Sequence, residues 1–351
     1  MIKRAVSCRI ITIPKGPTII TLLWLLNLPS YSLLRGQDAF KAHVKINSHK
    51  DRYLARVNLI TQAANTTCLV VGASGLIGGA LVGRLAERMI VHGVSRTRAL
   101  THQNFFWHRT DLTHPLRVQD LPERVDTVVY LAQSEFFRDF PERATDVFAV
   151  NTNQLLHFLD YARTAGVKRF VFASSGGVYG VGARQFSEDA NIPATGALGF
   201  YLSTKLCSEI LVQNYSGLFS TVILRFFFVY GAGQRRSMLI PRLVDSVRAG
   251  NPIELRGDQG IVVNPTHVSD AVASIECALE LDGSHTINIG GPDSLSLREI
   301  GEIIGRAVGK DPVFKINPDE GPADVVGGIE KMSRLLCAPR IAFADGLRSV
   351  L

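Results

Sequence analysis

The sequence contains few cysteines, and none of them is paired at a metal-binding spacing. Five cysteines are spread over 351 residues without a Cys-x-x-Cys motif, which excludes a zinc ribbon and does not fit a disulfide framework. Cys68 opens an apolar segment and Cys207 lies in a helical one, so we expect buried free thiols in a reducing compartment. The chain is therefore predicted to be cytoplasmic, with no metal site.

Charge is neither abundant nor concentrated in one stretch. The formal net charge is +7, and 20% of the residues are charged. Lys and Arg are scattered without a long basic run, whereas nucleic-acid binders usually concentrate charge on one face. The composition is 46% hydrophobic, as in globular proteins, and repeats and low-complexity tracts are absent. We expect no nucleic-acid partner.

The sequence also lacks an apolar run long enough to predict a membrane-spanning helix. Near the N-terminus, "PTIITLLWLLNLP" holds about a dozen mostly apolar residues, whereas a span needs about 20. No small-x-small cleavage site follows, as a signal peptide would require. Residues 1–65 are thus an extension of unknown role: a degenerate targeting segment, a short membrane-associated extension, or residues outside the functional domain. We favour the last interpretation.

From residue 67 onward, short apolar runs alternate with helical segments. The runs "TCLVV", "MIVHGVS", "DTVVYLA", "KRFVFASS" and "STVILRFFFVYG" predict strands, while "VFAVNTNQLLHFLDYARTAG" and "STKLCSEILVQNYSG" predict helices. Near-continuous apolar strands separated by helices indicate a parallel sheet covered on both faces. The predicted fold is α/β, a doubly wound parallel Rossmann sheet with a smaller mixed C-terminal substrate-binding lobe. We expect the Rossmann domain over residues 66–235 and the lobe over 236–351, with a strand near 285–291 returning to the main sheet.

The first predicted strand runs directly into the glycine-rich stretch "GASGLIGGAL". Gly72, Gly75 and Gly78 permit a turn with positive φ and a close approach of the backbone to a pyrophosphate. The helix that begins there points its free N–H groups and the positive end of its dipole at the phosphates. An ordinary tight turn would use the same residues, but the position between strand and helix predicts a dinucleotide-binding domain.

The end of the second strand indicates which dinucleotide binds. An acidic residue there hydrogen-bonds the 2′-hydroxyl of NAD, whereas an arginine accommodates the 2′-phosphate of NADP. Here Ser95 stands in the acidic position, with Arg96 and Arg98 beside it. The cofactor is therefore predicted to be NAD(P), with NADP favoured, although both arginines can equally be solvated surface residues. Asp111 in "RTDLTHP" can reach the adenine or serve only as a turn residue.

Tyr201 and Lys205 are spaced for acid–base catalysis. Free tyrosine has a pKa of about 10, and an ammonium one helical turn further on favours the phenolate. A second donor, needed to polarise a carbonyl, should lie at the carboxyl end of a central strand. "KRFVFASSGGVYG" supplies Ser174 and Ser175 at that position. Together these residues predict hydride-transfer chemistry.

These motifs resemble, in residues and in order, those of the extended short-chain dehydrogenase/reductase family of epimerases, dehydratases and reductases. The resemblance covers about residues 67–351 and includes "GASGLIG", "DTVVYLAQ", "VFAVNTNQLL", "VFASSGGVYG", "YLSTK", "RFFFVYGAGQ", "THVSDAV" and "INIGG". It implies that Ser175 is the catalytic hydroxyl, Tyr201 the acid/base, and Lys205 the residue that lowers the tyrosine pKa and holds the nicotinamide ribose. The residues expected to contact the dinucleotide are Gly72, Ser74, Gly75, Leu76, Ile77, Gly78, Ser95, Arg96, Asp111, Leu112, Leu131, Ala132, Gln133, Asn151, Tyr201, Lys205 and Phe228.

Departures from the family pattern restrict the chemistry. Family dehydratases place Asp-Glu directly after the catalytic hydroxyl, where this chain has Gly176 and Gly177, so dehydration is disfavoured. Phe228 and Val263 replace an asparagine and an arginine that contact the substrate diphosphate in sugar-nucleotide enzymes of the family. Three arginines are candidates to compensate: Arg235, Arg236 and Arg242.

We therefore expect an NAD(P)-dependent epimerase or reductase that acts on a small-molecule substrate, either a sugar nucleotide or a related carbonyl compound. Two alternatives stay open: an NADPH-dependent carbonyl reductase of a non-nucleotide substrate, and a non-catalytic dinucleotide-binding protein. The resemblance also implies a possible homodimer. Membrane association of the N-terminal extension stays open as well.

Overall fold

The computed structural model describes residues 66–182, 185–193, 198–318 and 323–351. These residues belong to one compact unit, Gln62–Leu351. The predicted extension, residues 1–65, lies outside the described residues, and so does its predicted targeting or membrane role. Within the described ranges, no helix has both the length and the apolar character needed to cross a bilayer.

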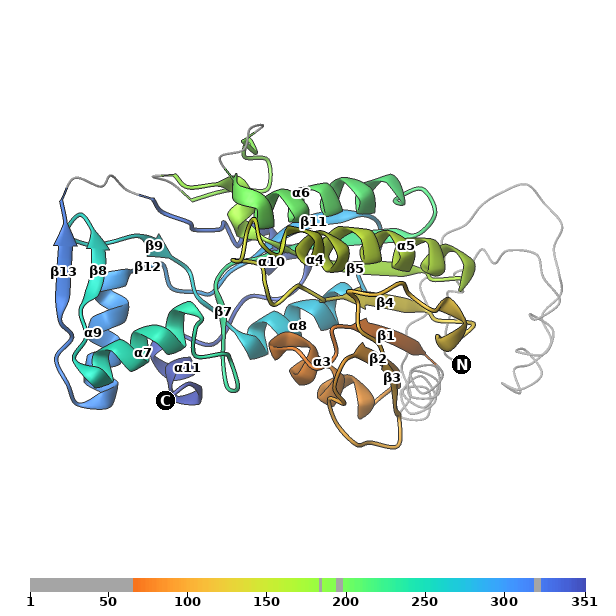
Figure 1. Ribbon diagram of the computed structural model, residues 1–351, viewed down its shortest axis with the longest axis horizontal. Helices are drawn as coiled ribbons and strands as arrows, with labels where there is room; N and C mark the ends of the chain where they lie inside the picture. The colour runs from red at the N-terminus through yellow and green to blue at the C-terminus, as the bar shows by residue number, and fades with distance from the viewer. Residues whose placement is uncertain (1–65, 183–184, 194–197, 319–322) are drawn as a thin grey trace, which may run out of the picture. The chain divides into compact units, whose positions relative to one another are not determined.

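A seven-stranded sheet forms the centre of the unit, in the order β11-β6-β5-β4-β1-β2-β3 (Figure 1). Every neighbouring pair of strands is parallel. This confirms the predicted Rossmann-like α/β sheet, and its first six strands follow the order of dinucleotide-binding folds. The strands are β1 (Thr67–Val71), β2 (Ile90–Ser95), β3 (Phe105–Arg109), β4 (Thr127–Tyr130), β5 (Arg169–Ser175), β6 (Ser220–Phe226) and β11 (His285–Ile289).

The register of the sheet brings the strand ends together along one edge. Val71, the last residue of β1, pairs with Val94 in β2 and with Tyr130 at the end of β4. At the end of β5, Ser175 pairs with Phe226, which in turn pairs with Ile289. Side chains that follow these ends therefore face a common space, where wound sheets bind ligands.

Helices cover both faces of the sheet, because side chains of successive strand residues point to opposite sides. On one face lie α3 (Leu76–Ala86) and α8 (Val268–Ala278), whose apolar residues pack with those of the strands. On the other face lie α4 (Ala144–Phe148), a π-helical turn η2 (Ala149–Asn153), α5 (Gln154–Thr164) and α6 (Gly199–Asn214) (Figure 1). The single long helix expected before residue 165 is thus interrupted at η2.

The thiol prediction is confirmed at one position and wrong at the other. Cys68 is fully buried in β1, where burial raises the pKa of its thiol to about 12. Cys207 is exposed, because it lies on the outer side of α6 between the buried residues Thr204 and Ser208.

The C-terminal part of the chain forms small sheets and helices around their own apolar core, to which Tyr230, Ile253, Ile304 and Phe343 belong. Helix α9 (Leu297–Val308) begins with a capping box between Ser296 and Glu299. Strand β11 leaves this part of the chain and joins the central sheet beside β6. The remaining elements are η1 (Val118–Asp120), η3 (Gly176–Tyr179), β7 (Val229–Tyr230), α7 (Leu239–Ala249), β8 (Ile253–Arg256), β9 (Val262–Val263), β10 (Thr266–His267), β12 (Leu295–Ser296), α9 (Leu297–Val308), β13 (Phe314–Asn317), α10 (Glu330–Leu335), α11 (Phe343–Gly346) and η5 (Leu347–Ser349).

Candidate active site

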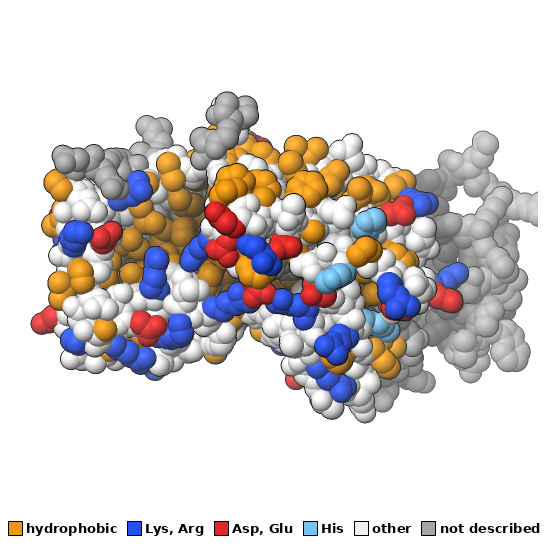
Figure 2. Space-filling model, viewed as in Figure 1, with side chains coloured by type: hydrophobic (Ala, Val, Ile, Leu, Met, Phe, Trp, Pro, Cys, Tyr) orange, Lys and Arg blue, Asp and Glu red, His pale blue; other side chains and the backbone are white. Residues whose placement is uncertain are grey.

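A cleft of about 1060 Å³ lies at the carboxyl ends of the strands. Pockets for one small ligand usually measure about 300–1,000 Å³, so this cleft has room for a dinucleotide together with a substrate. Every predicted catalytic and cofactor-binding residue lines it except Asn151. Figure 2 shows acidic and basic side chains next to each other at the centre of one face, beside a hollow lined by hydrophobic side chains.

The glycine loop forms one end of the cleft, and its geometry requires glycine. Gly72 has a φ of +89°, and its N–H donates to the Val94 carbonyl at 2.9 Å. A Cβ on Gly78 would lie 2.1 Å from the Gly72 carbonyl oxygen, so no larger residue fits there. Helix α3 follows with Gly75 as an N-cap that supplies no side-chain acceptor. The loop thus leaves backbone N–H groups for an anion, which fits a dinucleotide pyrophosphate.

The residues after β2 and β3 form the predicted adenosine side of the cleft. The Ser95 hydroxyl donates to the Thr97 carbonyl at 2.6 Å and is therefore already engaged. Arg96 points into the cleft wall, whereas Arg98 donates to the Leu100 carbonyl. The Thr113 backbone N–H donates to Asp111 at 3.0 Å and, together with the nearby Arg96 charge, lowers the pKa of that carboxyl.

The segment after β4 forms the long wall of the cleft. Leu131, Ala132 and Gln133 line it, whereas Asn151 is fully buried behind it. The Asn151 Oδ1 accepts a hydrogen bond from the Ser134 N–H at 3.0 Å, and its Nδ2 donates to the Thr204 hydroxyl at 3.0 Å. Asn151 thus fixes the wall to α6 from behind and is not among the residues that line the cleft.

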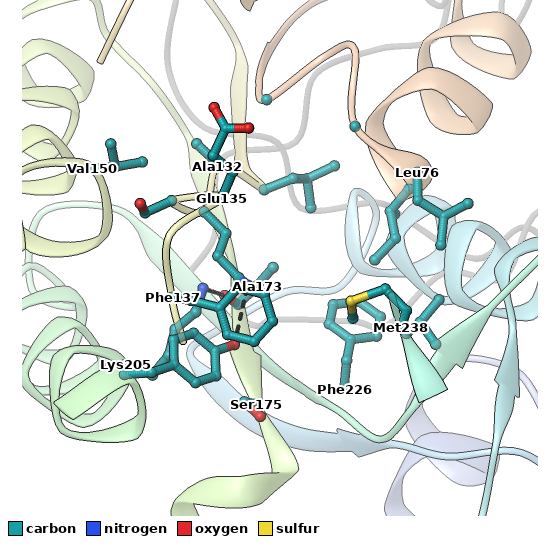
Figure 3. Close-up of a pocket in the computed structure, with 18 of the residues that line it drawn as sticks. Leu76, Ala132, Glu135, Phe137, Val150, Ala173, Ser175, Lys205, Phe226 and Met238 are labelled. Carbon is teal, nitrogen blue, oxygen red and sulfur yellow. Dashed lines mark hydrogen bonds between the residues drawn. The ribbon is translucent and has the colours of Figure 1, made fainter. Parts of the chain in front are cut away.

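The three predicted catalytic residues lie at the same end of the cleft. Ser175 ends β5, and its Oγ accepts a hydrogen bond from the Gly177 N–H at 3.2 Å. The half-buried Tyr201 phenol donates to Gln133 Oε1 at 2.9 Å. Burial raises the pKa of Tyr201 to about 12, and a hydrogen bond with Ser175 offsets part of the rise. Figure 3 shows Lys205 and Phe137 on one side of this end, with Phe226 and Met238 on the other.

The Lys205 ammonium is hydrogen-bonded to a backbone carbonyl and not to the Tyr201 phenol. Its side chain is 2% exposed, and its ammonium donates to the Ala173 carbonyl at 2.8 Å, above the Phe172 ring. Burial lowers the pKa of Lys205 to about 8, against the attraction of the Glu209 carboxylate. Burial of the phenol is the largest influence on the Tyr201 pKa, and the effect of Lys205 on that pKa stays a prediction.

A buried polar network supports the catalytic end from below. Ser174 donates to Glu209, and Glu209 forms an ion pair with Arg225 at 2.6 Å. Arg225 also donates to the Tyr179 hydroxyl at 2.7 Å, which donates to Asn288 at 2.8 Å. The network joins α6, β6, η3 and β11, so the strand end that carries Ser175 is fixed by four elements.

Phe228 adopts a strained backbone conformation in the cleft wall. Its φ is +42°, in the left-handed region that bulky residues rarely adopt. The segment is held on both sides, because the Phe227 N–H donates to the Ile289 carbonyl and the Phe228 carbonyl accepts from Thr266. Such strain is often found at functional sites, which is consistent with the predicted contact between Phe228 and a ligand.

One charged residue in the wall, Glu135, was not predicted from the sequence. Its carboxylate is shared by Arg96, at 2.5 Å, and Arg235, at 3.1 Å. The partners are 39 and 100 residues away in the chain, so no local spacing could reveal the cluster. Among the described residues, no group of three or more His, Cys, Asp or Glu side chains is placed to hold a metal ion.

The fold and the cleft define a Rossmann-type protein whose ligand site lies at the carboxyl ends of a parallel sheet. A model of the NAD dependent epimerase/dehydratase family matches residues 68–290. The chain belongs to this family and is an enzyme of its extended short-chain dehydrogenase/reductase type, which includes epimerases and reductases.

Relatives and solved structures agree with this assignment. UDP-glucuronate 4-epimerase of Thermodesulfobacterium geofontis is 28% identical over 254 residues, which are 70% of this chain and 78% of the relative. dTDP-4-dehydro-6-deoxyglucose reductase of Escherichia coli is 26% identical over 304 residues, 81% of this chain and 96% of the relative. The structure of MoeE5 in complex with UDP-glucuronic acid and NAD is similar with a TM-score of 0.70 and 29% identity, over 81% of this chain and 97% of that one.

Proposed function

We propose that this chain is an NAD-dependent epimerase or reductase that oxidises or reduces a secondary alcohol or carbonyl group, with Tyr201 as the acid/base. The observation that supports this proposal is the convergence of Ser175, Tyr201 and Lys205 at one end of a cleft whose other end is the glycine loop. A bound nicotinamide supplies the hydride chemistry. The chain itself contributes backbone N–H groups for the pyrophosphate and side chains for proton transfer.

The pKa values indicate whether Tyr201 and Lys205 are protonated at neutral pH. With a pKa of about 12, the Tyr201 phenol is protonated at neutral pH and can donate its proton to a carbonyl oxygen. To act as a base towards an alcohol, it needs further positive charge nearby. The Lys205 ammonium, with a pKa of about 8, is mostly charged at pH 7 and is held against the end of β5 by the Ala173 carbonyl. The Ser175 hydroxyl is available as the second donor to the substrate oxygen.

We propose a nucleoside-diphosphate sugar as the substrate class, because the relatives named above act on such compounds. Of the three arginines expected to compensate, Arg235 lines the cleft, where it pairs with Glu135, whereas Arg236 and Arg242 are not among the described lining residues. Val263 is fully buried in β9, so the position at which other family members have an arginine contributes no charge here.

A non-nucleotide carbonyl compound, reduced at the expense of NADPH, is the second candidate. The observation in its favour is the apolar part of the cleft lining, with Phe226 and Met238 across from Lys205 (Figure 3). Phe227, Phe228 and Leu239 also line the cleft. Such a surface suits an apolar substrate better than a diphosphate.

Dehydration is disfavoured by packing as well as by residue type. A Cβ on Gly176 would lie 2.3 Å from the Phe227 ring, and one on Gly177 would lie 2.8 Å from the Leu202 side chain. The space in which family dehydratases carry their acid and base is therefore filled, and a carboxylate cannot be accommodated there without displacing Phe227.

Purified protein supplied with NAD and either UDP-glucose or UDP-glucuronate tests the proposal, with the products resolved by NMR. A parallel reaction with NADPH and a panel of ketones, followed by nicotinamide absorbance, tests the second candidate. Tyr201→Phe should reduce turnover by about 10²–10⁴-fold and leave dinucleotide binding intact. The matched control is Tyr215→Phe, since Tyr215 caps the other end of α6. Unchanged turnover in Tyr201→Phe would contradict the acid/base assignment, and dinucleotide binding without turnover of any substrate would favour a non-catalytic binder.

A further inference from the structure

The ion-pair cluster around Glu135 has a direct bearing on the choice of dinucleotide. Arg96 follows the last residue of β2, the position from which this fold contacts the adenine ribose. An arginine there would ordinarily favour NADP, because its guanidinium binds the 2′-phosphate. In this structure, however, Arg96 Nη1 already donates to Glu135 Oε1 at 2.5 Å.

Glu135 is held in this position from two directions. Its second oxygen accepts from Arg235 at 3.1 Å, so turning away from Arg96 would strain that pair as well. The backbone on either side is also fixed, because Ser134 N–H donates to the buried Asn151 and Phe136 N–H donates to the Ser134 hydroxyl at 3.2 Å. The carboxylate is thus a built feature of the cleft wall.

The charges at this end of the cleft cancel. Arg96 and Arg235 are positive, and Glu135 and Asp111 are negative; all four line the cleft. Hydrogen bonds from Thr113 to Asp111 and from Arg96 to Glu135 lower the pKa of each carboxyl, so both are ionised at neutral pH. A 2′-phosphate brings about two more negative charges and would meet a paired guanidinium and two carboxylates. A ribose 2′-hydroxyl brings no charge and can donate to a carboxylate.

We propose that Glu135 is a specificity-determining residue that makes this chain prefer NAD over NADP, despite the arginine after β2. The inference rests on the proposed function only in requiring that the cleft binds a dinucleotide. It reverses the preference that the sequence of the β2 end suggests, since Glu135 removes the free cation on which that preference depends.

Binding of NAD and NADP to the full chain, measured by calorimetry without substrate, tests the proposal. The wild type should bind NAD at least about tenfold more tightly than NADP. This factor is what one charge repulsion that is partly screened by water would produce. Glu135→Gln should reduce the ratio of the NADP dissociation constant to the NAD dissociation constant by about tenfold, mainly through tighter NADP binding. Titrations with 2′,5′-ADP and 5′-AMP should show the same change and assign it to the 2′-phosphate. Arg96→Ala in the Glu135→Gln background should abolish the gain.

Two controls separate charge at this site from general effects. Arg98→Ala removes an arginine from the same segment, and Glu87→Gln neutralises an exposed glutamate at the end of α3; neither should change the ratio. If Glu135→Gln lowers the melting temperature, Glu135→Met, which also removes the carboxylate charge, serves instead and should narrow the preference for NAD to the same extent. A wild type that prefers NADP, or a ratio that Glu135→Gln leaves unchanged, overturns the inference. A wild type that binds neither dinucleotide overturns the proposed function instead.

Discussion

Tyr201 and Lys205 lie one turn apart on α6 and have pKa shifts in opposite directions, because burial penalises the charged form of each. The phenol becomes harder to ionise and the ammonium easier to neutralise. Both shifts therefore oppose the phenolate–ammonium pair that the spacing suggests. In our proposal, the pair forms only when further positive charge is bound in the cleft.

The Lys205 shift predicts a pH dependence of stability. Its pKa falls from 10.5 to about 8 on folding, so the folded state favours the neutral amine. Stability is then lowest at and below pH 8 and rises as the pH increases towards 10.5. Between pH 8 and 10 the wild type should gain about 2 kcal/mol relative to Lys205→Met, as measured by urea unfolding at both pH values.

Lys315→Met is the control for this prediction, because the Lys315 side chain is 61% exposed. It should follow the wild type across the pH range. Parallel curves for Lys205→Met and the wild type would show that the ammonium is solvated in the folded chain.

Residues that act through local spacing could be predicted from the sequence, and those that act through distant partners could not. The glycine loop is one short stretch between a strand and a helix. By contrast, Gln133 accepts a hydrogen bond from the Tyr201 phenol, although 68 residues separate the two in the sequence. Glu135 pairs with Arg96 and Arg235, which are 39 and 100 residues away. The side chains around the phenol and the charge balance at Arg96 thus become visible only in the folded chain.

At the scale of elements, α6 is bound to the sheet by a buried ion pair. The Glu209 and Arg225 side chains are 1% and 5% exposed. Neutralising one partner leaves the other charge buried without compensation, which costs about 3–5 kcal/mol. Glu209→Gln should therefore lower the free energy of unfolding by that amount in urea denaturation.

The exposed pair between Arg163 and Asp160 on α5 provides the comparison. Its side chains are 51% and 60% exposed, so Asp160→Asn should change stability by less than about 1 kcal/mol. Equal effects of Glu209→Gln and Asp160→Asn would mean that the α6 pair is open to water.

Strands buried on both faces were predicted well, because their apolar runs are nearly continuous. The edge strand β3 was not among the predicted strands, since only Phe105 of its five residues is buried. The π-helical turn η2 was also missed, because its residues continue the helical pattern on either side. Both elements depend on tertiary contacts more than on local pattern.

At the scale of the whole molecule, the helices α4, α5 and α6 leave large apolar side chains exposed. Phe148, Leu156 and Ile210 are 48%, 40% and 52% exposed, on three helices that cover the same face of the sheet (Figure 1). We expect a second copy of the chain to cover this face, because apolar groups of this size are stabilised by burial.

Light scattering coupled to size-exclusion chromatography should show a dimer at micromolar concentrations, and Ile210→Glu should shift it to a monomer. Val313→Glu is the control, since Val313 is 48% exposed but precedes β13 in the C-terminal lobe. A monomeric wild type, or a dimer unaffected by Ile210→Glu, would contradict this expectation.

The position of strand β11 in the sheet affects how the protein folds during translation. On the ribosome, β6 is synthesised well before residues 285–289 emerge, so the nascent sheet has an open edge along β6 in the meantime. Unpaired backbone groups at such an edge can pair with other chains. A fragment that stops at residue 235 would keep that edge permanently, and the central sheet of this enzyme is therefore completed only after residue 289 has been translated.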